Sequence, residues 1–210
     1  ALLLAAARGV ARGDRYVRTG NWSAGDPWAL GQRVSGATLG LVGFGEIAQA
    51  VARRAAGFGM KVVYWNRSAR DDAAAALGAT RCVDLDELLG QADFVSLHLP
   101  LTEETEALIG AARLAAMKPG AVLINTARGA VVDEAALIDA LQSGHLSAAG
   151  LDVFPAEPAV PAALLTMDQV VLTPHIGSAT AACRSDMAMR ALNNLMTFLG
   201  GGTPPDRLPA

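Results

Sequence analysis

The chain has 210 residues, of which 52% are hydrophobic and 18% charged, and its formal net charge is −3. This composition is typical of a globular protein with a large core and excludes a disordered chain. The small negative charge and the lack of a dense Lys/Arg cluster argue against a nucleic-acid partner. Two cysteines are too few for a disulfide framework, so we expect a reducing, cytoplasmic location.

The first residues of the chain are apolar, but Arg8 and Arg12 interrupt them early. A membrane-spanning helix needs about 20 apolar residues, and a secretory signal carries its charge before the apolar run. We therefore expect neither, and no membrane partner. The sequence has no initial Met. We expect it to be part of a longer protein, with its first residue inside a helix.

From residue 37 onward, strand-like and helical patterns alternate, which predicts an α/β fold with a doubly wound parallel sheet of the Rossmann type. Strands are expected at residues 37–42, 61–65, 93–97, 121–124, 146–151 and 169–172. The preceding residues 13–36 are less regular. We expect Trp22 and Trp28 in this region either to form a subunit interface or to pack over the domain's own core.

Helices are expected between these strands. One spans residues 46–56, with Ile47, Val51 and Ala55 on one face. Asp84 and Asp133 stand at N-cap positions, and the helix after Asp84 is expected to end before Gly90. A long amphipathic helix at residues 181–199 precedes three glycines and a proline-rich tail at residues 203–210. Its aligned apolar residues are Met187, Ala191, Leu195 and Leu199.

The first strand leads into the motif Gly43-x-Gly45-x-x-Ala48. Gly43 permits a sharp turn, Gly45 lets the backbone approach a phosphate, and Ala48 lets the helix pack close to the strand. The backbone N–H groups that follow would face a pyrophosphate at the positive end of the helix dipole. A glycine-rich turn without a ligand is the alternative. The candidate dinucleotide contacts are Gly43, Phe44, Gly45, Glu46 and Ile47.

The end of the second strand bears on the choice of nicotinamide cofactor. Proteins that bind NAD usually carry Asp or Glu there, which holds the ribose 2′-hydroxyl. This chain instead has two guanidinium groups and a hydroxyl, which suit a 2′-phosphate. We expect NADP(H) to be favoured over NAD(H), the alternative being that both arginines are ordinary surface charges. The candidate contacts are Asn66, Arg67, Ser68 and Arg70.

Five segments, in order and spacing, resemble the D-isomer-specific 2-hydroxyacid dehydrogenases. They are residues 39–48, the motif His98-x-Pro100-x-Thr102, and residues 117–129, 150–158 and 174–180. The resemblance covers nearly the whole chain. Ser178-Ala179-Thr180 and Asn193-Asn194-Leu195 are most similar to the glyoxylate/hydroxypyruvate reductases of that family.

The resemblance implies three catalytic residues. Arg128 would bind the substrate carboxylate and polarise the C2 carbonyl. His175 would protonate the carbonyl oxygen during reduction, and Glu157 would orient His175 and favour its protonated form. Hydride would pass between nicotinamide C4 and substrate C2, so we expect no metal. Taken singly, these residues also fit a surface charge, a structural histidine and a loop residue.

The resemblance also implies weaker cofactor contacts. Asp152 would hold the nicotinamide carboxamide, and Arg128 and His175 would also contact the cofactor. The other implied contacts are Thr126, Ala127 and Gly177 beside the nicotinamide, and Leu99, Pro100 and Thr105 on the adenosine side. His98 is expected to be a structural, hydrogen-bonding residue, and His145 an exposed turn residue.

Family members are longer and are implied to close a second, flavodoxin-like substrate domain over the cofactor. Residues 1–36 would be a linking helix and dimerisation arm, 37–178 the dinucleotide-binding domain, and 179–210 a helix and tail returning toward the second domain. Most of that second domain is missing from this sequence. We expect a homodimer that reduces small 2-keto acids with NAD(P)H, and severely reduced turnover by this chain alone.

Two alternatives to a glyoxylate/hydroxypyruvate reductase stay open. The first is another 2-hydroxyacid dehydrogenase, of the phosphoglycerate or D-lactate type. A formate dehydrogenase is disfavoured because that branch has Gln where Glu157 stands. The alternative from another class is a transcriptional corepressor, which shares the fold and uses the dinucleotide as a redox-sensing ligand.

Overall fold

The computed structural model describes residues 1–20, 22–25 and 27–207. Within this part the chain forms two compact units, one of residues 1–175 and one that begins at residue 176. None of the described helices is long and apolar enough to cross a membrane.

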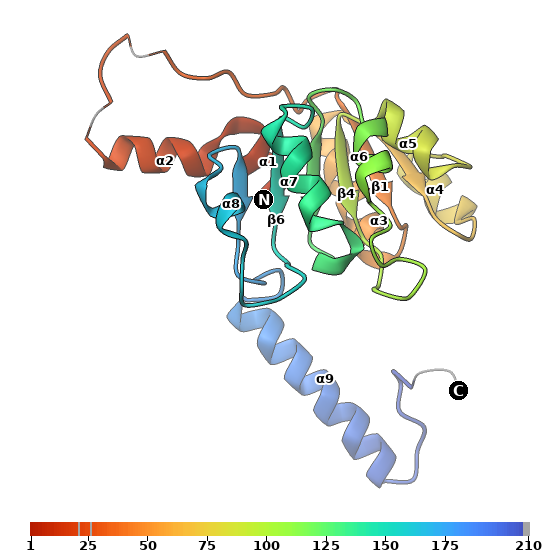
Figure 1. Cartoon of the computed structure of the whole chain (residues 1–210). Coiled ribbons are helices and arrows are strands. Elements are labelled where there is room, and N and C mark those ends of the chain that lie inside the picture. The colour runs from red at the N-terminus through yellow and green to blue at the C-terminus, as the bar shows by residue number, and fades with distance from the viewer. Residues whose placement is uncertain (21, 26, 208–210) are drawn as a thin grey trace. The chain divides into compact units, whose positions relative to one another are not determined.

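The first unit is built on a parallel sheet in which the described strands follow the order β3-β2-β1-β4-β5-β6-β7 (Figure 1). After β3 the chain returns to the other side of β1, so the strand order reverses between β1 and β4. In open sheets of this kind, ligands bind beyond the carboxyl ends of the strands at the reversal. The predicted doubly wound sheet is confirmed. The strands are β1 (Thr38–Val42), β2 (Lys61–Trp65), β3 (Ala79–Arg81), β4 (Phe94–Leu97), β5 (Val122–Asn125), β6 (Ala148–Leu151) and β7 (Val170–Leu172).

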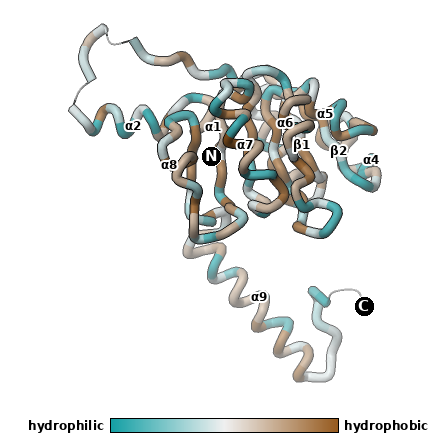
Figure 2. Tube along the Cα trace, viewed as in Figure 1, coloured by the Kyte–Doolittle hydropathy of each residue, from teal (hydrophilic) through white to brown (hydrophobic). Residues whose placement is uncertain are grey.

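Helices cover both faces of this sheet, whereas α2 (Val10–Arg18) extends away from it and buries no residue (Figure 1). The other helices of this unit are α1 (Leu2–Arg8), α3 (Glu46–Ala55), α4 (Asp71–Leu77), α5 (Leu85–Gln91), α6 (Ala111–Ala116), α7 (Glu134–Gln142) and α8 (Ala162–Thr166), with 3-10 turns η1 (Ala56–Phe58) and η2 (Gly129–Val131). Successive strand side chains enter opposite cores. Leu39 and Leu41 pack with residues of α1 and α3, whereas Val42 packs with α5 and α7. Hydrophobic residues accordingly cluster around β1 in Figure 2.

Local capping explains where two of the predicted helices begin. The Asp84 carboxylate accepts a hydrogen bond from the N–H of Asp86 at 3.1 Å, and that of Asp133 from Ala136 at 3.1 Å. The helix after Asp84 continues through Gly90 to Gln91, so the expected end before Gly90 is wrong. Glycine inside a helix lowers its stability without ending it when the helix packs on a core.

Helix α3 packs on the sheet through alanines. Its buried residues are Ala48, Ala52 and Ala55, while Ile47 is 70% exposed. The expected apolar face through Ile47 is therefore wrong. The small alanine side chains let α3 lie close to the sheet, which is the role predicted for Ala48. Ile47 in the first turn of α3 stays open to solvent.

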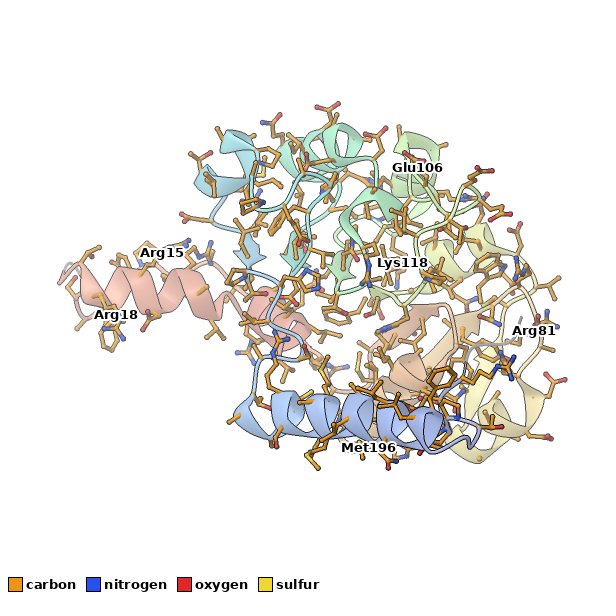
Figure 3. All side chains as sticks on the ribbon, turned by 90° about the horizontal axis from the view of Figure 1, so that it is seen from below. Arg15, Arg18, Arg81, Glu106, Lys118 and Met196 are labelled. Atoms are coloured by element: carbon orange, nitrogen blue, oxygen red, sulfur yellow. The ribbon has the colours of Figure 1, made fainter. Side chains whose placement is uncertain are left out.

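The N-terminal segment is more regular than expected. Helix α1 buries Ala6 and Ala7 against β5, β6 and β7, and α2 extends to Arg18, into a region predicted to be irregular. Gly9, with a φ of 61°, separates the two helices. Arg15 and Arg18 project from α2 (Figure 3) and form ion pairs with Asp168 and Asp14, each at 2.9 Å.

The two tryptophans do not cover the core of the first unit, so that alternative is wrong. Trp22 is 67% exposed, and Trp28 is 41% exposed. Trp28 packs on α2 instead, with its ring centroid 5.4 Å from that of Tyr16 and the guanidinium of Arg12 4.6 Å above it. Asp26, in the same predicted connector, lies outside the described residues.

The second unit consists of α9 (Ala181–Leu199) and its tail, and the predicted helix bounds are confirmed. The Asp206 carboxylate accepts hydrogen bonds from Arg190 Nε and Asn194 Nδ2, both at 2.7 Å. These bonds, chiefly that from Arg190, lower the pKa of Asp206 to about 2. The end of the predicted proline-rich tail, residues 208–210, lies outside the described residues.

Candidate active site

In the glycine loop between β1 and α3, Gly43 and Gly45 have different structural environments. Gly43 has a φ of 91°, and a Cβ there would lie 2.7 Å from the carbonyl oxygen of His98. The fold therefore requires glycine at this position. Gly45 has a φ of −76°, and a Cβ there would meet nothing within 4 Å. The open space beside Gly45 is where a bound group could approach the backbone.

Helix α3 begins at this open space without a side-chain cap. Gly45 is its N-cap residue and offers no side-chain hydrogen bond to the first N–H groups of the helix. Those N–H groups, from Glu46 and Ile47 onward, have no partner within the helix, and the helix dipole is positive there. The residues present thus fit an anionic group such as a pyrophosphate.

Phe44 lies between the two glycines and anchors the loop to the core. Its side chain is fully buried and stacks on Tyr64 with ring centroids 4.0 Å apart. Its N–H donates to Asn66 Oδ1 at 3.1 Å, and its carbonyl accepts from Gln49 Nε2 at 3.0 Å. These contacts leave no exposed surface of Phe44 for the direct ligand contact that the sequence suggested.

The loop after β2 is tied to the glycine loop. Asn66, besides holding Phe44, donates through Nδ2 to the carbonyl of Ser68 at 2.8 Å. The N–H of Arg70 donates to the Tyr64 hydroxyl at 3.3 Å. The segment that bears Arg67, Ser68 and Arg70 is therefore fixed beside the glycine loop, while its charged side chains stay exposed.

The carboxylate of Glu104, which is not among the predicted site residues, lies near this segment. Glu104 lies in the loop after β4, where its pKa is lowered mainly by the hydrogen bond from the Thr102 hydroxyl and to a smaller degree by the charge of Arg67. No spacing rule links positions 67 and 104, because the proximity of the two charges depends on β2 and β4 lying on either side of β1 in the sheet.

The loop after β4 contains the other residues predicted on the adenosine side. Leu99 borders the glycine loop, since its Cδ2 lies 3.0 Å from the position of a Cβ on Gly43. The Thr105 hydroxyl donates to the Pro100 carbonyl at 2.7 Å and accepts from the N–H of Thr102 at 2.7 Å. This hydroxyl thus orders the loop from within.

Two histidines lie away from the predicted acid–base position. His98 Nε2 is 2.9 Å from the Ser96 hydroxyl, and burial lowers the pKa of His98 to about 4, which agrees with the expected structural role. His145 was expected to be an exposed turn residue, and this is wrong. It is half-buried, and its Nε2 lies 3.1 Å from the Leu114 carbonyl oxygen.

Glu157 and His175 meet beyond the carboxyl ends of β6 and β7. His175 Nδ1 lies 2.8 Å from Glu157 Oε2, and Glu157 Oε1 accepts the N–H of Phe154 at 2.9 Å. These hydrogen bonds, chiefly that from His175, hold the pKa of Glu157 below its usual value. With Nδ1 held by an ionised carboxylate, Nε2 is the ring nitrogen available for proton exchange.

The backbone of His175 is in the left-handed region, with a φ of 52°. Its N–H donates to the carbonyls of Asp152, at 3.0 Å, and Thr173, at 3.1 Å. Asp152 is buried, and its carboxylate accepts the Thr173 hydroxyl at 2.5 Å. The conformation of His175 is thus fixed by neighbours on both sides.

Arg128 lies on the loop after β5, the strand next to β6 in the sheet. Its side chain is exposed, and its Nη1 donates to the carbonyl of Ala127 at 2.6 Å. Thr126 beside it is exposed and Ala127 is buried. The three predicted catalytic residues therefore follow three adjacent strands at one edge of the sheet. Gly177 belongs to the second unit.

No cluster of three or more His, Cys, Asp or Glu side chains suited to a metal ion occurs among the described residues. The polar groups at the carboxyl edge of the sheet include the guanidinium of Arg128, the imidazole–carboxylate pair of His175 and Glu157, and the N-terminus of α3. Such a set can bind a carboxylate, exchange a proton and hold a phosphate.

Comparison with known proteins agrees with this geometry. The family model for the NAD binding domain of D-isomer specific 2-hydroxyacid dehydrogenases matches residues 1–177. Glyoxylate reductase of Thermococcus litoralis is 49% identical over 211 aligned positions, which cover 98% of this chain and 63% of that protein. This chain thus spans less than two thirds of the length of that relative.

Two solved structures are similar over most of this chain. A Thermus thermophilus protein is 51% identical with a TM-score of 0.90, covering 97% of this chain and 64% of its own. The NADPH-dependent glyoxylate/hydroxypyruvate reductase of Sinorhizobium meliloti is 37% identical with a TM-score of 0.88, covering 97% and 63%. The matched motifs, the sheet and these similarities together show that the chain belongs to the D-isomer specific 2-hydroxyacid dehydrogenase family.

Proposed function

We propose that this chain carries the cofactor-binding and proton-transfer part of a reductase that converts small 2-keto acids, above all glyoxylate and hydroxypyruvate, to 2-hydroxy acids with NAD(P)H. The observation that carries the proposal is the 2.8 Å contact between His175 and Glu157 at the same edge of the sheet as the glycine loop. The relatives described above include two proteins named as glyoxylate reductases.

Each residue of the proposed site has a chemical task. Arg128 binds the substrate carboxylate and draws electron density from the C2 carbonyl. His175 gives its Nε2 proton to the carbonyl oxygen, and Glu157 stabilises the imidazolium before this transfer. The hydride that C2 receives would come from a bound dihydronicotinamide. With one hydride and one proton added, the carbonyl would become a hydroxyl group.

The glycine loop and the loop after β2 would hold the cofactor. Gly45 and the N-terminus of α3 fit a pyrophosphate, as argued above, and Arg67, Ser68 and Arg70 would bind a 2′-phosphate. We therefore propose NADP(H) over NAD(H). The Sinorhizobium meliloti relative is named as NADPH-dependent, which supports this choice. Glu104 opposes it, because its charge would repel a 2′-phosphate held by Arg67.

We further propose that the protein is a cytoplasmic homodimer and that α2 with the following connector forms part of the interface. The side chains of Tyr16, Val17, Trp22 and Trp28 border an apolar surface cavity of about 340 Å³. Exposed aromatic residues of this kind are enriched at subunit interfaces. Sedimentation of wild type and Trp22→Ser tests this part, with dissociation expected for the variant.

Cofactor oxidation tests the proposed activity. Glyoxylate, hydroxypyruvate, pyruvate and phenylpyruvate are each supplied with NADPH and with NADH, and the absorbance of the reduced cofactor is followed. We expect the highest kcat/KM with glyoxylate or hydroxypyruvate and NADPH, and loss of turnover in His175→Asn. Turnover by a version extended with a relative's substrate domain should exceed that of this chain.

The same panel separates the alternatives. Preference for pyruvate or phenylpyruvate would indicate another 2-hydroxyacid dehydrogenase. Tight dinucleotide binding without oxidation of any substrate by the extended version would contradict the reductase and favour a redox-sensing binding protein.

A further inference from the structure

We propose that Asn125 is a positioning residue that holds the loop of Arg128 where its guanidinium can meet the substrate carboxylate. The inference rests on the proposed function. Asn125 is the last residue of β5 and is 1% exposed. Both polar atoms of its side chain are hydrogen-bonded to the loop that follows.

Both ends of the Asn125 amide are used on that loop. Oδ1 accepts the N–H of Ala127 at 3.0 Å, and Nδ2 donates to the carbonyl of Arg128 at 3.0 Å. The main-chain carbonyl of Asn125 accepts the N–H of Asp152, also at 3.0 Å. One side chain therefore fixes the backbone on both sides of the Cα of Arg128, and its own backbone joins this loop to the segment after β6.

The guanidinium of Arg128 has little else to fix it. Its Nη1 donates to Ala127, which belongs to the same loop, and the side chain is exposed. This bond moves with the loop and cannot anchor it to the sheet. The position of the guanidinium thus follows from the position of the loop backbone. Asn125 holds this backbone on both sides of the Cα of Arg128, while backbone bonds from Ala107 and Ile109 hold its continuation at residues 130 and 131.

The anchored loop also packs directly against the segment that leads to Glu157. A Cβ on Gly129 would overlap the backbone of Phe154 and Pro155, and the N–H of Phe154 donates to Glu157 Oε1 at 2.9 Å. A shift of the Arg128 loop would therefore change its spacing from Glu157 and His175. This spacing matters because carboxylate binding and proton transfer act on the same small substrate.

Asparagine is the side chain that suits this place. Aspartate could accept from Ala127 but would repel the carbonyl oxygen of Arg128. Alanine would remove the acceptor of the Ala127 N–H and leave the Arg128 carbonyl with the N–H of Val131, at 3.3 Å. Serine can accept from a nearby N–H in a similar turn but is too short to donate to the Arg128 carbonyl. Asn125→Ser is thus the conservative variant and Asn125→Ala the full deletion.

A double-mutant cycle on the version extended with a relative's substrate domain tests the inference. The kcat/KM for glyoxylate is measured for wild type, Asn125→Ala, Arg128→Ala and the double variant. We expect Asn125→Ala to lower kcat/KM by about 100-fold when Arg128 is present, as for a catalytic group displaced by about 1 Å. In the Arg128→Ala background the same change should have an effect within about twofold. Asn125→Ser should fall between wild type and Asn125→Ala.

Two further readouts separate positioning from a general structural effect. The Kd for NADPH should stay within about twofold of wild type, and the affinity for oxamate, an unreactive carboxylate analogue of glyoxylate, should fall with kcat/KM. Leu123→Ala, at a buried core residue of the same strand, is the matched control. It should lower the thermal midpoint without weakening oxamate binding. If Asn125→Ala folds poorly, the cycle is run with Asn125→Ser.

The outcomes are distinguishable. Equal losses from Asn125→Ala in both backgrounds, or no loss in either, would overturn the positioning role of Asn125 and leave the proposed function intact. Unchanged kcat/KM in Arg128→Ala alone would instead contradict the proposed function of Arg128. A loss of NADPH affinity that parallels the loss of kcat/KM would also overturn the inference, because it would indicate a general structural effect.

Discussion

The Cα of Gly43 faces the carbonyl oxygen of His98 so closely that a methyl group on Gly43 would lie 2.7 Å from that oxygen. Gly43→Ala should therefore destabilise the fold, by about 1–3 kcal/mol for the left-handed conformation and the clash together. Gly45→Ala should leave stability nearly unchanged, because the space beside Gly45 is open. Both variants should weaken dinucleotide binding.

Urea denaturation and NADPH titration of the two variants check this contrast. Each variant is the control for the other, since the two glycines lie in the same loop and are separated by a single residue. Equal loss of stability in both would contradict the distinction, and unaltered NADPH affinity in Gly45→Ala would contradict the phosphate site.

The contact between Glu157 and His175 predicts a large loss of activity when the carboxylate is removed. In Glu157→Gln a neutral amide replaces the carboxylate that is hydrogen-bonded to His175 Nδ1. The rate of reduction should fall by about 10²-fold or more. The measurement is kcat/KM for glyoxylate. His145→Gln, which alters a remote histidine, should keep the wild-type kcat/KM, and an unchanged kcat/KM in Glu157→Gln would refute the pairing role.

The segment after β2 predicts a change of cofactor preference. Arg67→Ala should raise the Kd for NADPH about tenfold through loss of a charge-assisted hydrogen bond, and should change the Kd for NADH little. Glu104→Gln should act in the opposite direction, because it removes a negative charge near Arg67. Fluorescence titration with both cofactors measures the ratio. A parallel change for NADPH and NADH would show that Arg67 does not meet a 2′-phosphate.

Burial of His98 predicts acid sensitivity of the fold. Its pKa is about 4 in the folded protein, against 6.5 for an ordinary histidine. Between these values the unfolded chain binds a proton that the folded chain does not, so the stabilisation is present above pH 6.5 and is lost as pH falls toward 4. The loss from this residue is at most about 3 kcal/mol.

Unfolding free energies from urea titrations at several pH values test this. His98→Gln can keep a hydrogen bond to Ser96 without titrating, so its stability should depend less on pH in this window. Ser96→Ala keeps His98 and should retain the wild-type slope. Identical slopes for wild type and His98→Gln would exclude His98 as the source.

The strands that lie in the middle of the sheet could be predicted because residues buried on both faces form short apolar runs, as in residues 93–97 and 121–124. The short outer strand β3 could not, since Thr80 and Arg81 are exposed and carry no such signal. Ile47 was misplaced because the 3.6-residue period fits both the Ile47 face and the Ala48 face of α3. Only packing against the sheet decides between them.

In the candidate site, too, the residues that a local pattern marks could be predicted. Gly43 and Asn66 are examples, because each stands at a fixed distance from a strand end. The neighbourhood of Arg67 and Glu104, the half-burial of His145 and the close approach of Gly129 to Phe154 could not. Each of these depends on contacts between segments far apart in the chain, which no local pattern records.

His175 occupies a backbone conformation that costs most side chains about 1–2 kcal/mol, and its N–H is shared between Asp152 and Thr173. Anyone transplanting this acid–base pair into another scaffold would have to copy that bend and both carbonyls as well. A histidine grafted at the right Cα position on an ordinary strand or helix would aim its imidazole elsewhere. The transferable unit is the whole bend.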